Sequence, residues 1–333
     1  MSLVSAHHRP PTGLDGAGLL VVDKPAGMTS HDVVARCRKL LNTRKIGHAG
    51  TLDPMATGVL VLGVERATKM LGLLSLTTKA YSATVRLGQS FDTDDAEGQL
   101  LRADGAAAVD PAALAAAVAA LTGNLQQVPA SVSALKVDGQ RAHVRVRAGE
   151  QLDLPARPVT VSRFDVLARR TASVDSLPVV DLDVEVECTS GTYVRALARD
   201  LGVALGTGGH LTALRRTRVG PFTLEHARTL EQLAEQPQVS LDTDVAALTA
   251  FGRREVDADE ALTVSHGRWL EPRGIEGVHA AVDAEGRVVA LLEESGGRAR
   301  TVMVVRPSTL GPAPQPPTAT PSGPVKAPDI QQP

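Results

Sequence analysis

Hydrophobic and polar positions follow two different periods along the first 240 residues, which predicts a mixture of strands and helices. Apolar stretches and apolar–polar alternation predict strands over 18–24, 58–64, 79–88, 157–169 and 179–188. Helical spacing predicts helices over 31–42, 67–74, 110–123, 192–205 and 230–236, and Ser30 is a candidate N-cap for the first. Because these elements do not repeat as regular βαβ units, they indicate an α+β fold with a mixed, mainly antiparallel central sheet and flanking helices.

The same pattern divides the chain into four segments. Residues 1–16 are polar and rich in Gly and Pro, which predicts a flexible arm, and residues 17–240 form a large domain. Residues 241–306 show short apolar stretches separated by Gly turns, which predicts a small β-rich C-terminal module. The remaining 27 residues, 307–333, contain 9 prolines and little apolar surface, so we expect a disordered Pro-rich tail.

Composition narrows the class of protein. Hydrophobic residues make up 43% of the 333 residues, but no apolar run approaches the roughly 18 residues that a membrane helix needs. The N-terminal residues lack the pattern of a secretory signal, and Cys37 and Cys188 are isolated, so neither a disulfide framework nor a zinc site is indicated. We therefore expect a cytoplasmic protein that needs no metal and no membrane.

Charge is distributed unevenly, although the net charge is only −2. Residues 1–240 carry 26 basic and 24 acidic side chains, whereas residues 241–306 carry 8 basic and 12 acidic ones. The large domain therefore has a mild positive balance, which permits RNA binding without demanding it.

One acidic residue stands out once the familiar cofactor and hydrolase motifs are found to be missing from the sequence. The chain has no P-loop, no GxGxxG after a strand, no GxSxG and no HExxH. The acidic run DTDDAEG, residues 92–98, lacks the glycine and glutamate spacing of a calcium loop and is interpreted as a solvated turn. Asp53 remains, as a lone carboxylate in the Gly-rich stretch GHAGTLDPMATG, residues 47–58, directly before an apolar strand.

This stretch resembles the GHxGxLDPxATG signature of the TruB family of tRNA pseudouridine synthases. Further blocks resemble the family in the same order: the KPxGxTS turn in 19–34, the KxYxxxxxLG segment in 79–98, the SALK element in 128–143, the CxxGTYIR helix start in 188–202 and the HLxxLRR segment in 209–222. The resemblance covers roughly residues 17–235. It implies a pseudouridine synthase fold for the large domain. The C-terminal module lacks a clear PUA signature, and for its short strands we expect a reduced PUA-like barrel.

The resemblance implies that the protein converts the uridine at position 55 in the T loop of tRNA to pseudouridine, after flipping the base out. Asp53 matches the catalytic carboxylate, which either attacks the nucleoside or removes a ribose proton. Arg195 matches the arginine that pairs with this carboxylate and keeps it ionised. Tyr81 matches a tyrosine whose ring stacks on the flipped uracil. Since the reaction gains no atom, no cofactor is expected.

Further residues are candidates for RNA contact. His48 matches a histidine that fills the space left by the flipped base, and Tyr193 is either a second wall of the site or a packing residue. Leu214 and Lys24 are further candidates, and phosphate contacts are expected from Arg141, Arg145, Arg147, Arg215, Arg216 and the Arg44/Lys45 pair. Many family members have tyrosines at the positions of Val132 and His143, so this chain lacks two aromatic rings that could stack or pack near the SALK element.

Several alternatives remain open. Two of them are a non-catalytic RNA-binding or tRNA-folding protein and a dyskerin-like subunit of a guide-RNA complex. The retained catalytic set opposes the first, and the neutral, Pro-rich tail opposes the second. A glycosidase normally needs two paired acids, whereas this motif offers one. The expected protein is thus a monomeric enzyme that acts on the T arm of tRNA and requires no protein partner.

Overall fold

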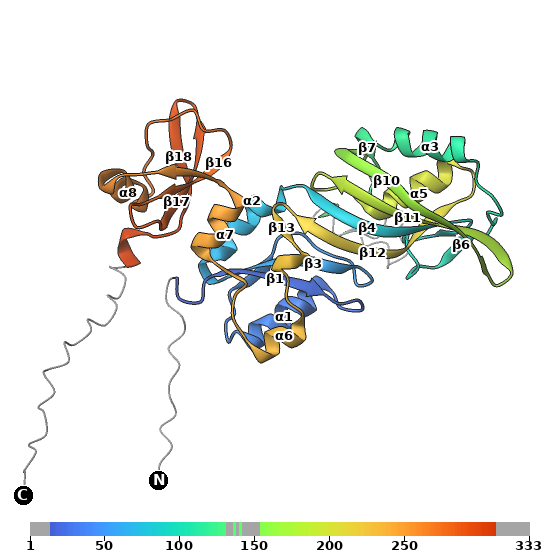
Figure 1. Cartoon of the computed structure of the whole chain (residues 1–333), viewed down its shortest axis with the longest axis horizontal. Coiled ribbons are helices and arrows are strands. Elements are labelled where there is room, and N and C mark those ends of the chain that lie inside the picture. The colour runs from blue at the N-terminus through green and yellow to red at the C-terminus, as the bar shows by residue number, and fades with distance from the viewer. Residues whose placement is uncertain (1–13, 131–135, 138–139, 142–153, 311–333) are drawn as a thin grey trace, which may run out of the picture.

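A ten-stranded mixed sheet forms the centre of the molecule, and a four-stranded sheet forms a separate C-terminal layer (Figure 1). The computed structural model describes residues 14–130, 136–137, 140–141 and 154–310. The predicted arm and tail fall largely outside these residues, apart from the segments 14–16 and 307–310.

The large sheet has the strand order β14-β1-β3-β12-β4-β11-β10-β7, with β2 added beside β3 and β13 beside β12. All of its pairs are antiparallel except β3 with β12. This confirms the predicted α+β class with a mainly antiparallel sheet. The strands are β1 Gly18–Lys24, β2 Ile46–His48, β3 Thr57–Val64, β4 Lys79–Leu87, β7 Gly123–Gln127, β10 Arg157–Val174, β11 Leu177–Cys188, β12 Gly209–Val219, β13 Phe222–Thr223 and β14 Leu241–Asp242.

Helices cover the two faces of this sheet unequally. One face packs against α1 Ser30–Leu40, α3 Pro111–Ala120, α5 Val194–Ala204 and α6 Leu230–Glu235. The other face, near β1 and β3, packs against the 3-10 helix η1 Glu65–Met70, α2 Leu71–Ser75 and α7 Thr243–Ala250. The remaining short elements are η2 Leu224–His226, η3 Ser308–Leu310 and the strand pairs β5 Ser90–Phe91 with β6 Leu100–Arg102 and β8 Lys136–Val137 with β9 Gln140–Arg141.

Strand β11 shows how the alternating sequence produces the sheet. Its valines and leucine at 180, 182, 184 and 186 are buried in the core beneath the helices. Its acids point to the opposite face, where Asp181 pairs with Arg86 and Glu185 pairs with Arg163. The period of two therefore places one set of side chains in the core and leaves the other partly solvated.

The C-terminal module is a four-stranded sheet, β15 Gly252–Glu255, β16 Val278–Val282, β17 Val288–Ser295 and β18 Arg298–Val304, with α8 Ala258–Ser265 packed on it. Its apolar side chains continue the core beneath β1 and β3, and Arg306 pairs with Asp244 at 2.5 Å. The module is therefore docked firmly on the large domain. Strand β14 belongs to the large sheet, so residues 241–242 add to that sheet, and the division of the chain after residue 240 stays a prediction.

The start of α1 corrects one prediction. The N-cap is Thr29, not Ser30, because the Thr29 hydroxyl accepts a hydrogen bond from the Asp32 N–H. In return, the Asp32 carboxylate accepts a hydrogen bond from the Thr29 N–H, which completes a capping box. Ser30 is the first residue of the helix and is buried. Its side chain is thereby free to bind another part of the chain.

Candidate active site

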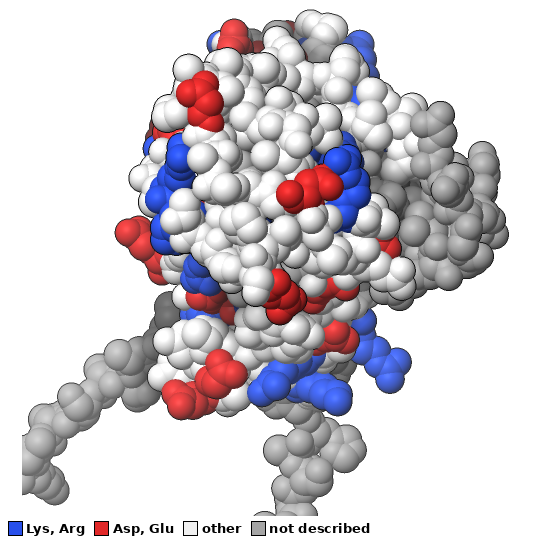
Figure 2. Space-filling view, turned by 90° about the vertical axis from the view of Figure 1, so that its right-hand side faces the viewer, with Lys and Arg blue, Asp and Glu red and all other residues white. Residues whose placement is uncertain are grey.

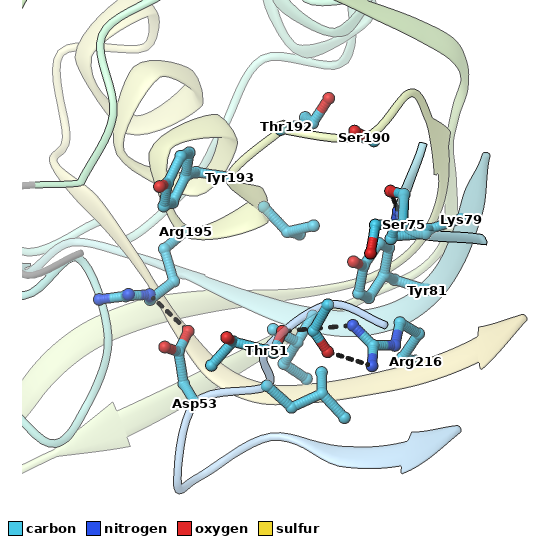
Figure 3. Close-up of a pocket in the computed structure, with 15 residues that line it drawn as sticks. Thr51, Asp53, Ser75, Lys79, Tyr81, Ser190, Thr192, Tyr193, Arg195 and Arg216 are labelled. Atoms are coloured by element: carbon cyan, nitrogen blue, oxygen red, sulfur yellow. Dashed lines mark hydrogen bonds and ion pairs between the residues drawn. The ribbon is translucent and has the colours of Figure 1, made fainter. Parts of the chain in front are cut away.

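A cavity of about 320 Å³ opens where the loop between β2 and β3 meets the beginning of α5 (Figure 3). This volume lies near the lower end of the range for small-ligand sites, about 300–1,000 Å³. The residues around it come from four separate segments of the sequence, 50–53, 75–81, 190–195 and 214–216. They are Gly50, Thr51, Leu52, Asp53, Ser75, Lys79, Tyr81, Ser190, Gly191, Thr192, Tyr193, Val194, Arg195, Leu214 and Arg216.

Two glycines allow the Asp53 loop to lie against the sheet. Gly50 has a φ of 98° and Gly58 a φ of 96°, a region that side chains disfavour. A Cβ on Gly58 would lie 2.2 Å from the carbonyl oxygen of Arg216 in β12, so no side chain fits there. The Gly-rich character of the motif follows from this close backbone approach.

Three side chains from other elements hold the backbone of the Asp53 loop. The Ser30 hydroxyl accepts a hydrogen bond from the Leu52 N–H at 2.8 Å and donates one to the Leu52 carbonyl at 3.1 Å. The Lys24 ammonium donates to the carbonyls of Pro25 and Pro54, at 2.8 and 3.1 Å. Burial lowers the pKa of Lys24 to about 8, while the Asp53 charge opposes this shift.

Arg216 is the third of these side chains and is buried like the other two. It is only 1% exposed, and its guanidinium donates to the carbonyls of Gly50, Thr51 and Val59, at 3.1, 3.3 and 2.7 Å. We predicted a phosphate contact for this residue. The structure contradicts that role, because its donors are committed to the loop beneath the cavity; Arg216 positions the loop and forms part of the cavity wall.

Asp53 and Arg195 face each other across the cavity mouth, with Arg195 Nε 3.0 Å from Asp53 Oδ2 (Figure 3). The Arg195 side chain is 5% exposed, whereas that of Asp53 is 37% exposed. Burial in the concave site raises the pKa of Asp53, and the Arg195 guanidinium opposes that rise. The pair therefore presents a charge-supported carboxylate with one side open to the cavity.

The acidic run 92–98 fixes Arg195 from behind, which the sequence interpretation missed. Arg195 Nη1 lies 3.2 Å from Asp95 Oδ2 and donates to the Thr93 carbonyl at 2.7 Å. One helical turn later, Arg199 pairs with Asp94 at 3.0 Å. Asp94 and Asp95 are 6% and 3% exposed, so the predicted solvated turn is wrong: these acids are buried because α5 supplies two guanidinium groups.

Tyr81 lies on β4 directly opposite Arg216 on β12 and is 8% exposed. Burial raises the pKa of its hydroxyl, and the nearby Arg216 charge opposes this. Tyr81, Tyr193 and Leu214 all line the cavity, and Tyr81 and Tyr193 lie on different sides of it (Figure 3). An apolar and aromatic enclosure of this kind suits a flat heterocyclic ring.

Lys79, which the sequence predictions omitted, lies beside Tyr81 in the cavity wall. Its ammonium donates to the carbonyls of Ser75 and Thr77, both at 3.0 Å, and burial lowers its pKa to about 8. The alternation of buried residues along β4 was a signal that could have found it, since positions 79 and 81 share a face of the strand.

Other predicted RNA contacts lie outside the cavity. His48 is half-buried at the end of β2 and packs edge-on against His31, with ring centroids 5.7 Å apart. Its Nδ1 has no hydrogen-bond partner among the described residues, and burial lowers its pKa. Arg215 forms a two-pronged pair with Asp23, at 2.9 and 2.7 Å, so its charge is already matched.

Part of the predicted RNA-binding set lies outside the residues that the structure describes. The side chain of Arg141 and the whole of Arg145 and Arg147 lie outside the described residues, as do Val132 and His143. Across the part of the chain that the structure describes, no group of three or more His, Cys, Asp or Glu side chains is arranged to hold a metal ion. Within the same residues, no helix is long and apolar enough to span a membrane.

Comparison with solved structures defines the class of fold. The chain is similar to the protein in "Crystal Structure of a Cbf5-Nop10-Gar1 Complex", with 25% identity, a TM-score of 0.65 and coverage of 88% of this chain and 86% of that one. A second similar structure, "Structure of H/ACA RNP bound to a substrate RNA containing 2'-deoxyuridine", gives 24% identity and a TM-score of 0.64, covering 90% and 88% of the two chains. The fold is that of the pseudouridine synthases.

Sequence comparison identifies the family. Residues 38–194 match the model for the TruB family pseudouridylate synthase N-terminal domain, 195–251 the tRNA pseudouridylate synthase B C-terminal domain and 251–306 the tRNA pseudouridine synthase II C-terminal domain. tRNA pseudouridine synthase B of Rhodococcus jostii is 69% identical over 92% of this chain and 100% of its own length, and that of Nocardia farcinica is 69% identical over 88% and 94%. The chain belongs to the TruB family of pseudouridine synthases.

Proposed function

We propose that this protein converts a uridine of tRNA to pseudouridine, and that the uridine is the one at position 55 in the T loop. The observation that carries the proposal is the open carboxylate of Asp53, paired with Arg195 in a cavity with aromatic walls. The similarity to enzymes named tRNA pseudouridine synthase B supports tRNA as the substrate.

The reaction breaks the N1–C1′ bond of uridine, turns the uracil and forms a C5–C1′ bond. C5 loses a proton and N1 gains one, so the product is an isomer and no redox equivalent or phosphate donor is consumed. Both candidate roles of Asp53, attack on the nucleoside and removal of a ribose proton, require an ionised carboxylate. Arg195 supplies the charge that offsets the effect of burial on the Asp53 carboxyl.

The remaining cavity residues suit the holding of an extruded base. A stacked base must leave its neighbours before it can enter an enclosed site, at a cost of a few kcal/mol. Tyr81 offers a ring for stacking, and Leu214 and Tyr193 complete the enclosure. His48 lies at the end of the strand that leads into the Asp53 loop, where it can occupy the position that the base vacates.

The alternative functions are less well supported. A guide-RNA subunit is suggested only by the solved structures, which are 24–25% identical, whereas the tRNA enzymes are 69% identical. A binding protein without catalysis would not require the Asp53–Arg195 pair. A glycosidase would need a second open acid, and Asp95, which lies behind Arg195, is only 3% exposed.

We further propose that the enzyme acts in the cytoplasm as a monomer, on the T arm, without a guide RNA or protein partner. The test is to incubate the purified protein alone with an unmodified tRNA transcript and map pseudouridine at each position. We expect modification at position 55 only, and none in a transcript with cytidine there. Asp53→Asn should abolish turnover while it preserves folding and tRNA binding. Turnover by a well-folded Asp53→Asn protein would refute the assignment.

A further inference from the structure

A second hollow, of about 550 Å³, lies on the surface between the end of α1 and the start of β2. It is lined by Arg38, Lys39, Asn42, Thr43, Arg44, Lys45 and Glu65. We call Arg38, Lys39, Arg44 and Lys45 the α1–β2 cation cluster. Figure 2 shows Lys and Arg side chains on the lower part of the molecule, with Asp and Glu side chains also present there.

The fold explains only part of this cluster. Arg38 donates to the Ile46 carbonyl at 2.8 Å, which fixes the turn into β2. Arg38 and Lys39 also lie in the last turn of α1, where cations are favoured by the helix dipole. Arg44 and Lys45 lie beyond the helix end, and neither of these reasons applies to them.

The charges in the hollow are poorly balanced. Glu65 is its one acid; it is 8% exposed, accepts a hydrogen bond from the Thr43 hydroxyl and lies 3.6 Å from Lys45. Lys45 is nevertheless 76% exposed, so this pair is weak. Four cations against one acid leave a local surplus of three positive charges, in a chain whose net charge is −2.

The hollow is also close to the proposed base-flipping residue. Lys45 is followed directly by β2, which ends three residues later at His48. At about 3.3 Å per residue, the edge of the hollow lies about 10 Å from His48 along the strand. This separation is short enough for one RNA strand to contact both His48 and the hollow.

We propose that this hollow binds backbone phosphates of the substrate RNA, a few nucleotides away from the flipped uridine. The proposal rests on the proposed function and adds a location for affinity that is separate from the chemistry. Arg and Lys side chains bind phosphates without reading the base, and each such contact releases counterions. Phosphates held here would fix the RNA strand while the target base enters the cavity and His48 occupies the position that the base leaves.

The test compares two double variants that lose the same total charge. Arg44→Gln/Lys45→Gln removes the exposed half of the cluster. Arg102→Gln/Arg287→Gln is the control, because both of its arginines already pair with acids outside the hollow. Binding of an unmodified tRNA transcript is measured over a range of salt concentrations, with turnover at saturating tRNA measured in parallel.

For the cluster variant we expect a Kd about 10-fold higher near 0.1 M salt and a salt slope, log K against log salt, lower by about 1.5, close to two phosphate contacts. Turnover at saturating tRNA should stay unchanged, and the control should match the parent protein. An unchanged Kd and slope in the cluster variant would overturn the proposal, as would loss of turnover with unchanged binding. Failure of the proposed function would be recognised separately, as absence of pseudouridine with the parent protein.

Discussion

Two buried arginines, Arg195 beside the cavity and Arg254 in the C-terminal module, have similar partners and different surroundings. The Arg195 side chain is 5% exposed and contacts Asp53 and Asp95; that of Arg254 is 1% exposed and contacts Glu260 and Glu294, at 3.0 and 3.7 Å. Each arginine thus joins two acids from separate segments of the chain. The two sites differ in the other groups that these acids bind.

Both acids of the module are used by the structure itself. Glu294 accepts hydrogen bonds from the N–H groups of Arg273, Gly274 and Ile275, which lowers its pKa, and Glu260 completes the capping box of α8. In the large domain Asp95 is committed in the same way, to Thr93 and the Glu97 N–H.

Asp53 differs from the other three acids because it faces a cavity. A buried arginine between two acids therefore does not by itself mark a catalytic site. A candidate catalytic site is distinguished by one acid whose charge the arginine supports and whose carboxylate is also exposed to the substrate cavity.

The largest effect should come from removing the cavity arginine. Arg195→Met is expected to reduce turnover about 10²–10³-fold, as removal of one preorganised charge partner does in other enzymes. Binding of tRNA should change much less, because the 5% exposed guanidinium has little surface for phosphate. Single-turnover assays and direct binding measurements separate the two. Equal losses in both would mean that Arg195 contacts the RNA backbone.

The matching change in the module should affect stability and not chemistry. Arg254→Met leaves Glu260 and Glu294 without their shared cation, and breaking a buried pair costs about 3 kcal/mol in unfolding free energy. Trp269, the single tryptophan, lies in the module and reports its unfolding by fluorescence in denaturant. Turnover per folded molecule should equal that of the parent. A loss of turnover without a loss of stability would erase the distinction between the two arginines.

A smaller effect is expected when the acid behind Arg195 is neutralised. Asp95→Asn should lower turnover about 10-fold, since Arg195 loses one of its anchors. The Asp95 charge raises the pKa of Asp53, so its removal should lower that pKa. Asp53 must be ionised, and activity is lost as pH falls through its pKa. The acidic limb of the pH–rate profile should therefore move to lower pH in the variant.

Asp94→Asn is the matched control for this pH shift. Asp94 is the neighbouring buried acid and pairs with Arg199, one turn further along α5. The charges that shift the pKa of Asp53 are those of Arg195, Asp95 and Lys24, whereas the ion pair of Asp94 is with Arg199. Removal of the Asp94 charge should therefore weaken the attachment of the loop and leave the acidic limb in place. A shift of the limb to higher pH in Asp95→Asn would contradict the assigned direction.

The sequence predicted strands β1, β3, β4, β10 and β11 and most helices, because their periods are local properties, but it did not predict the central strand β12. It did not predict the burial of Asp94 and Asp95, because that burial depends on two arginines about 100 residues away. The juxtaposition of Asp53 and Arg195 could be expected only from family resemblance, since no local pattern links positions so distant. The family and the fold are confirmed, and the structure shows the contact between Asp53 and Arg195.

Arg215 and Arg216 illustrate a signal that was present but not used. Neighbouring residues on a strand point to opposite faces, so two adjacent arginines on β12 cannot both face solvent equally. Arg215 lies on the partly exposed side and Arg216 is buried. The helix start shows the same sensitivity to a shift of one position: with Thr29 as the N-cap, Ser30 turns inward toward the Asp53 loop.

The smallest predicted effect concerns that inward turn, and it tests whether the openness of Asp53 depends on how its loop is held. Ser30→Ala removes both hydrogen bonds to Leu52 and leaves a buried N–H without its partner, at a cost of about 1–3 kcal/mol. Thr29→Ala removes the helix cap one residue earlier and costs about 1 kcal/mol. If the loop position matters, turnover should fall about 3-fold to 10-fold in Ser30→Ala only. Equal turnover in the two variants at equal stability would mean that Lys24 and Arg216 hold the loop without Ser30.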